Sequence, residues 1–73
     1  MVLANIKTGE TVKIVKFRDE LETKAILTSM GIIPGDHLEV VSKSPFGSPI
    51  FFKHNLNNFF ALRRNQAELI EVE

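Results

Sequence analysis

MGIIPG, residues 30–35, joins a helical pattern to a strand pattern in six uncharged residues and decides the predicted fold. Gly31 can adopt the positive φ that ends a helix, and Ile32 can supply the apolar contact that accompanies a Schellman-type end. Pro34 and Gly35 occupy the central positions of a turn and favour type II. The stretch therefore predicts a helix end, a buried apolar contact and a turn into a strand.

The residues before this junction carry the helical pattern. Asp19 with Glu22 three positions later resembles a capping box, so we expect a short α-helix at about residues 20–30. Four residues recur at helical spacing and should form the stripe that faces the core: Thr23, Ile26, Leu27 and Met30.

Short alternating segments on both sides of the helix predict β-strands separated by turns. The expected strands are 11–17, 37–43, 50–54, 59–63 and 69–73, with turns at 44–49 and 55–58 and a connector at 64–68. In the first strand, Val15 and Phe17 should share one face, and Val12 and Ile14 the other. Many short strands with one helix favour a mainly β fold, a small closed or nearly closed barrel that leaves few exposed edges.

Composition limits the class of protein. The chain has 73 residues, 44% of them hydrophobic, which predicts one domain, residues 1–73, with a core that needs no metal or disulfide. Cysteine is absent, so disulfides and cysteine nucleophiles are excluded. Nine basic residues balance nine acidic ones, which argues against nucleic acid as a partner. No signal peptide or membrane span is evident, so we expect a cytoplasmic protein without direct membrane insertion.

The chain resembles the FeoA family, the small component of bacterial ferrous iron uptake. The resemblance rests on TGETVKIV (8–15), MGIIPGDHLEVV (30–41), SPFGSPI (44–50) and FALRRNQAELIEVE (60–73). It implies an SH3-like barrel of five or six strands with one helix inserted between early strands. It also implies action with FeoB, a membrane permease that has a cytosolic GTPase domain, and no catalytic chemistry. KHNLNNFFALRR (53–64) departs from the family pattern, because Asn57 or Asn58 must replace a turn glycine.

Apolar residues beyond the needs of the core are candidates for a contact surface. Phe46 lies at a predicted hairpin tip, and only one of Phe59 and Phe60 can point inward from a strand. Met30 and Ile32 either join that surface or fill the space between helix and barrel. The candidate partner-binding residues are Met30, Ile32, Pro45, Phe46, Gly47 and Phe59.

Metal binding is the alternative function. Residues 37 and 39 should project from one strand face, and imidazole and carboxylate groups suit Fe(II) or another divalent transition metal. The candidate ligands are Asp36, His37, Glu39 and His54, although no recognised ligand spacing connects them and ordinary solvent-facing side chains are the favoured explanation.

No enzyme motif is present, and we expect a non-enzymatic accessory protein of ferrous iron uptake. By the resemblance it docks on and regulates a FeoB-like GTPase permease, which would bring it to the inner face of the membrane. Arg63 or Arg64 could be supplied to a partner's nucleotide site, or the two could be solvated charges beside the last strand. Weak homo-oligomerisation is a further expectation.

Overall fold

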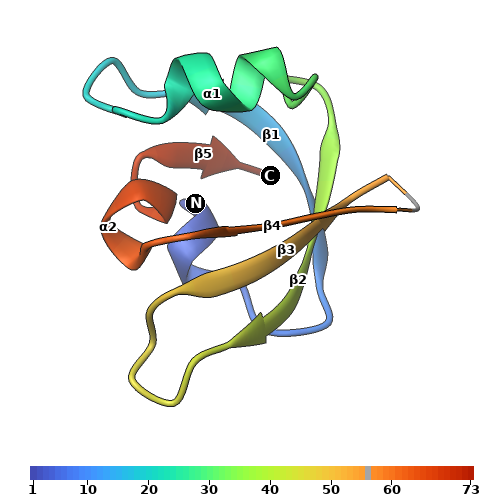
Figure 1. The fold of residues 1–73 in the computed structure, drawn as a ribbon, viewed down its shortest axis with the longest axis vertical. Helices are drawn as coiled ribbons and strands as arrows, with labels where there is room; N and C mark the ends of the chain where they lie inside the picture. The colour runs from blue at the N-terminus through green and yellow to red at the C-terminus, as the bar shows by residue number, and fades with distance from the viewer. Residues whose placement is uncertain (56) are drawn as a thin grey trace.

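The computed structural model describes residues 1–55 and 57–73. In this part of the chain, β-strands dominate, and they are accompanied by two short α-helices and one 3₁₀ turn (Figure 1). The elements are η1 (Leu3–Asn5), β1 (Thr11–Phe17), α1 (Lys24–Ser29), β2 (His37–Lys43), β3 (Ile50–His54), β4 (Asn58–Leu62), α2 (Arg64–Ala67) and β5 (Ile70–Val72). The predicted mainly β class is confirmed, and each strand lies within about one residue of its expected place.

The strands form one antiparallel sheet in the order β4-β3-β2-β1-β5. β1 serves two partners, because its first residues pair with β2 and its last residues pair with β5. The sheet curves as a result, and Figure 1 shows α1 at one end of the molecule and the β2–β3 hairpin at the opposite end.

An irregularity in β1 overturns the predicted alternation of its side chains. The register with β5 shifts between Ile14 and Lys16. Ile14 and Phe17 are therefore both buried, whereas Val15 is 43% exposed. The predicted pairing of Val15 with Phe17 on one face is wrong, because an extra residue inserted in a ladder moves every later side chain to the other face.

Helix α1 begins later than expected. Its N-cap is Thr23 and not Asp19, and no side-chain hydrogen bond caps it. Leu21 explains the difference: its N–H donates to Arg18 O at 3.0 Å in a separate turn, and its side chain is buried. Burial of Leu21 in a turn before the helix thus outweighs the local capping pattern.

The predicted core stripe of the helix is also mostly wrong. Leu27 alone among the residues of α1 is buried. Ile26 is 60% exposed and Met30 39% exposed, while Thr23 is half-buried and its Oγ1 donates to Gln66 Oε1 at 3.2 Å. Because this helix has only six residues, a single side chain reaches the core. The other apolar residues of the predicted stripe, Ile26 and Met30, therefore lie at the surface.

The junction after α1 has the helix end and the turn that residues 30–35 predicted. Ile32 N–H donates to Leu27 O at 2.9 Å and Gly31 N–H to Thr28 O at 3.0 Å, the two bonds of a Schellman motif. Gly31 has φ of +81°, and Ile32 is fully buried. The turn into β2 is closed by a bond from Asp36 N–H to Ile33 O at 3.1 Å.

The connection between β3 and β4 differs from the expectation in one residue. The predicted turn at 55–58 includes residue 56, which lies outside the described residues. Among the residues described, Asn55 has the positive φ, +61°, that was assigned to Asn57 or Asn58. Asparagine tolerates this conformation better than most other residues with a side chain, and the structure shows it at Asn55, not at the positions expected from the sequence.

The expected connector at 64–68 contains helix α2.

One hydrophobic cluster joins residues from every strand, from α1 and α2, and from η1. Its members are Leu3, Ala4, Ile6, Val12, Ile14, Phe17, Leu21, Leu27, Ile32, Leu38, Val40, Ile50, Phe52, Leu62, Ala67, Ile70 and Val72. Neither helix of the described chain is long and apolar enough to span a bilayer.

Candidate functional site

Phe46 is the most exposed large hydrophobic residue of the described chain, with 97% of its surface accessible. It stands at the tip of the β2–β3 hairpin, where Gly47 N–H donates to Ser44 O at 2.8 Å and closes a tight turn. Gly47 has φ of +83°, which glycine adopts without strain. Ser44 N–H donates to Pro49 O at 3.1 Å and closes the base of the tip. The backbone thus holds the aromatic ring out toward solvent.

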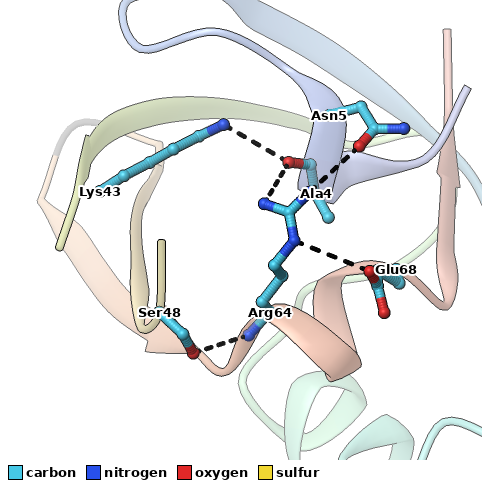
Figure 2. A network of polar contacts seen from close by, with 6 residues as sticks. All are labelled: Ala4, Asn5, Lys43, Ser48, Arg64 and Glu68. Atoms are coloured by element: carbon cyan, nitrogen blue, oxygen red, sulfur yellow. Dashed lines mark hydrogen bonds and ion pairs between the residues drawn. The ribbon is translucent and has the colours of Figure 1, made fainter. Parts of the chain in front are cut away.

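A network around Arg64 connects this hairpin to the rest of the molecule (Figure 2). Arg64 N–H donates to Ser48 Oγ at 3.0 Å. Its guanidinium reaches back to η1, with contacts of 3.5 Å to Ala4 O and 3.4 Å to Asn5 Oδ1. The same guanidinium lies 3.7 Å from the Glu68 carboxylate. Arg64 therefore links the hairpin tip to α2 and η1.

Lys43 adds a second connection at the base of the hairpin, because its Nζ donates to Ala4 O at 3.4 Å. The Arg64 side chain is thus engaged within its own chain, whereas Arg63 is exposed. The sequence indicated both arginines as candidates but not the role of Arg64 in anchoring the hairpin, because its contacts join residues up to 60 positions apart.

The candidate contact residues divide between the hairpin tip, where Pro45 and Gly47 flank Phe46, and more distant positions. Pro45 is exposed beside Phe46, but Met30 follows α1 at the opposite end of the molecule (Figure 1). Ile32 is fully buried, so its candidacy as a contact residue is wrong and the expected space-filling role is the observed one. Phe59 is 62% exposed on β4 and belongs to a different surface.

That surface is a shallow apolar groove on the outer side of β2, β3 and β4. Its volume is about 420 Å³. Phe59 alternates with the inward-facing Phe60, whose ring lies 5.4 Å from the buried Phe52 ring. The groove residues are Val41, Ser42, Phe51, Phe52, Phe59, Phe60 and Ala61. The sequence indicated a surplus aromatic residue here, but the groove depends on the pairing of three strands.

The metal-ligand candidates divide between two faces of the sheet. Asp36 and His54 do meet: His54 is buried, and its Nε2 donates to Asp36 Oδ2 at 2.9 Å. Asn58 Nδ2 lies 3.4 Å from the other ring nitrogen. His37 is exposed and Glu39 half-buried on the opposite face of β2. Within the described residues, no three His, Asp or Glu side chains gather as a metal site.

The Asp36–His54 contact supports the junction between α1 and β2. Asp36 Oδ2 also accepts a hydrogen bond from Ile33 N–H at 3.3 Å. The hydrogen bond from His54 is the main cause that lowers the pKa of Asp36, with smaller contributions from Ile33 and from the charges of His54 and His37. Burial acts in the opposite direction. The pair therefore has a structural explanation that requires no metal.

Comparison with known proteins agrees with this architecture. The family model of the FeoA domain matches residues 1–73. The chain belongs to the FeoA family. The FeoA protein of Chlorobium tepidum is 30% identical, with a TM-score of 0.89 over 99% of this chain and 68% of that one. Iron(II) transport protein A of Clostridium thermocellum is 36% identical, with a TM-score of 0.88; all of this chain matches 44% of that longer one.

A third FeoA structure connects the fold with the SH3 class. Stenotrophomonas maltophilia FeoA, solved with zinc, is described as a prokaryotic SH3 domain protein. It is 25% identical, with a TM-score of 0.81 over 100% of this chain and 89% of that one. No functionally curated protein matches the chain significantly. The predicted SH3-like FeoA fold is confirmed.

The FeoA family is associated with ferrous iron transport. It is an accessory family and not a known enzyme family. In this FeoA chain, three exposed apolar surfaces are candidates for contact with a partner: the hairpin tip with Phe46, the end of α1 with Met30, and the groove beside Phe59.

Proposed function

We propose that this chain is a non-enzymatic accessory protein of ferrous iron uptake that docks on the cytosolic part of a FeoB-like GTPase permease. The observation that carries the proposal is Phe46, 97% exposed at a hairpin tip. Family membership supports the transport role, and the exposed ring supports docking through this tip.

Phe46 makes no contribution to the core that would explain a large apolar side chain at this position. Burying a phenylalanine side chain contributes roughly 1.5–3 kcal/mol, and this gain is available only on association. Aromatic side chains are also enriched where protein surfaces meet. The exposed ring therefore favours an interaction role.

The construction of the tip lowers the entropic cost of binding. The Ser44–Gly47 turn and the bond from Arg64 N–H to Ser48 Oγ hold the loop before any partner arrives. A loop that is already ordered loses less freedom on binding than a flexible one. Docking then regulates the permease to the extent that the tip binds one of its conformations more tightly than another.

A binding measurement with the purified cytosolic domain of a FeoB-like permease tests the proposal. We expect Phe46→Ala to weaken binding about 30-fold, the loss typical of a central aromatic contact. Val15→Ala is the matched control, because Val15 is 43% exposed on β1 and should leave binding unchanged.

The same measurement is made with Fe(II) and with a chelator, and GTP turnover is followed in parallel. Binding that is independent of chelator supports an interaction protein. Failure of the wild-type chain to bind or to alter GTP turnover would refute the proposal. Stoichiometric Fe(II) uptake without any protein association would favour a metal-carrying protein instead.

A further inference from the structure

The two edges of the sheet differ in how they are covered. Beyond β5, the N-terminal segment forms a bridge between Val2 and Glu71, and Val72 N–H donates to Met1 O at 2.8 Å. β4 lies at the other edge and pairs only with β3. Within the described residues, no backbone hydrogen bond joins β4 to any other segment. One edge is therefore closed by the chain itself, and the other is open.

The open edge lacks the features that normally prevent pairing with another chain. Edge strands are usually protected by charged residues, proline or bulges. β4 has the sequence NFFAL, with no charge and no proline. Its register with β3 is regular over all five pairs, whereas the β1–β5 and β2–β3 ladders both contain an irregularity. The backbone of β4 is thus available as a template for another strand.

We propose that β4 pairs antiparallel with β4 of a second copy of this chain, which joins the two sheets across a two-fold axis at Phe60. This register uses the whole strand. It places Phe59 of each copy opposite Ala61 of the other, since antiparallel partners share a face of the combined sheet.

The side chains of this register are complementary in size. Ala61 is the small residue of the apolar groove, and Phe51 is its neighbour on β3. Phe59 is the large residue, 62% exposed at the other end of the same strand. Each Phe59 ring can therefore cover the other copy's Ala61 and reach toward its Phe51. Ala61 of each copy leaves space for the Phe59 ring of the other, and the two-fold axis repeats this contact at both ends of the paired strands.

The charges around the edge are compatible with pairing between identical chains. β4 carries no charge, so a copy meets no like charge directly across the new contact. Arg63 directly follows the strand and is exposed, and in the proposed register it lies opposite the uncharged Asn57 of the other copy. On β3, Lys53 lies beside Phe59, with its Nζ 6.0 Å from the ring centroid. In the proposed register it aligns with Phe51 of the other copy. The Lys53 residues of the two copies are separated across the joined sheet by three strand spacings, about 14 Å. This distance exceeds the Debye length at physiological ionic strength.

The small contact area indicates a weak association. A five-residue strand is about 17 Å long, so the contact is smaller than the roughly 800 Å² per partner that stable complexes bury. We expect a reversible dimer with a Kd of about 0.1–1 mM, formed at high local concentration. This inference concerns the β4 edge and does not depend on docking through Phe46.

Sedimentation velocity of the whole chain over about 0.01–2 mM tests the dimer, since these concentrations bracket its expected Kd. The sedimentation coefficient of the wild-type chain should rise with concentration. Ala61→Lys should abolish the rise, because it places a charge in the groove twice per dimer, and Phe59→Ala should weaken association at least tenfold. Val15→Lys is the matched control, because it adds the same charge at an exposed apolar residue of β1. Circular dichroism checks that each variant folds.

Amide chemical shifts measured on dilution locate the contact independently of any variant. We expect the concentration-dependent shifts to centre on residues 58–62 and the groove. A wild-type chain that stays monomeric at all concentrations would overturn the proposal and leave the edge to a strand of another protein. Association that survives Ala61→Lys, or shifts centred on the hairpin tip or α1, would also overturn it.

Discussion

Asp36 connects three parts of the chain through one carboxylate oxygen, which accepts hydrogen bonds from His54 Nε2 and Ile33 N–H. The bond from His54 is the largest cause that lowers the pKa of Asp36 in the folded chain. The unfolded chain therefore takes up the proton at a higher pH than the folded chain does. The stability contributed by Asp36 is complete above its unfolded pKa of about 4 and is lost as pH falls through the folded pKa.

Asp36→Asn should remove this part of the acid sensitivity. Asparagine can still accept the two hydrogen bonds, but it carries no charge to lose. We expect the free energy of unfolding of the variant, measured with urea between pH 3 and pH 7, to be lower at neutral pH and to fall less on acidification. Asp19→Asn is the control, because the structure shows no hydrogen bond to that carboxylate within the described chain. Equal acid dependence of Asp36→Asn and wild type would contradict this account.

Ile32 and Met30 belong to the same junction but differ in burial. Ile32 is fully buried and Met30 is 39% exposed. Ile32→Ala should lower the free energy of unfolding by about 2–5 kcal/mol, since it removes buried methyl groups and leaves a cavity. Met30→Ala should change it by about 1 kcal/mol or less, as expected for a partly exposed site. Urea unfolding of both variants measures the difference, and similar losses would show that Met30 packs as tightly as Ile32.

At the scale of elements, Gly31 ends α1 with a backbone conformation that side chains disfavour. Its φ is +81°, and a Cβ placed there would meet no atom within 4 Å. Gly31→Ala should therefore destabilise the fold through the backbone alone, by about 1–2 kcal/mol. Ser29→Ala, inside the same helix, should change stability by roughly 0.5 kcal/mol or less. Thermal unfolding compares the two, and a Gly31→Ala variant as stable as wild type would contradict the strained geometry.

The sequence predicts elements best where the deciding interactions are local. The Schellman end, the turn through Pro34 and Gly35 and the hairpin at 44–49 all close within six residues, and all three were predicted. The start of α1 was not, because Leu21 is drawn into a core built from distant strands. The two faces of β1 were misassigned for a similar reason, since its irregularity lies where the strand changes partners.

Helix α2 shows the same limit in a shorter segment. Four residues carry little periodicity, so RNQA gave no helical signal. Its position is fixed by long-range bonds: Gln66 Oε1 accepts from Thr23 N–H at 3.3 Å and from Thr23 Oγ1, while Arg64 reaches η1. The anchoring role of Arg64 therefore follows from the fold and could not be inferred from the sequence order.

At the scale of the whole molecule, apolar residues outside the core occupy separate surfaces. Sequence composition indicated that phenylalanines exceeded the needs of the core, and Phe46 and Phe59 are indeed exposed. Their separation could not be foreseen. Phe46 stands at the hairpin tip that joins β2 and β3. Phe59 lies on β4, where it pairs with Lys53 near the other end of β3. The groove itself exists only because Val41, Phe51 and Ala61 come together from three strands.

This separation predicts that partner docking and self-association are independent. Sites that are far apart and share no contacts usually have additive effects. Wild type, Phe46→Ala, Ala61→Lys and the double variant should therefore be compared both for permease-domain binding and by sedimentation velocity. Phe46→Ala should reduce only binding, Ala61→Lys only self-association, and the double variant should show both losses without further effect. If Ala61→Lys also weakens permease binding, the β4 edge contributes to the docking surface, and a chain paired through β4 would have to separate before it could dock.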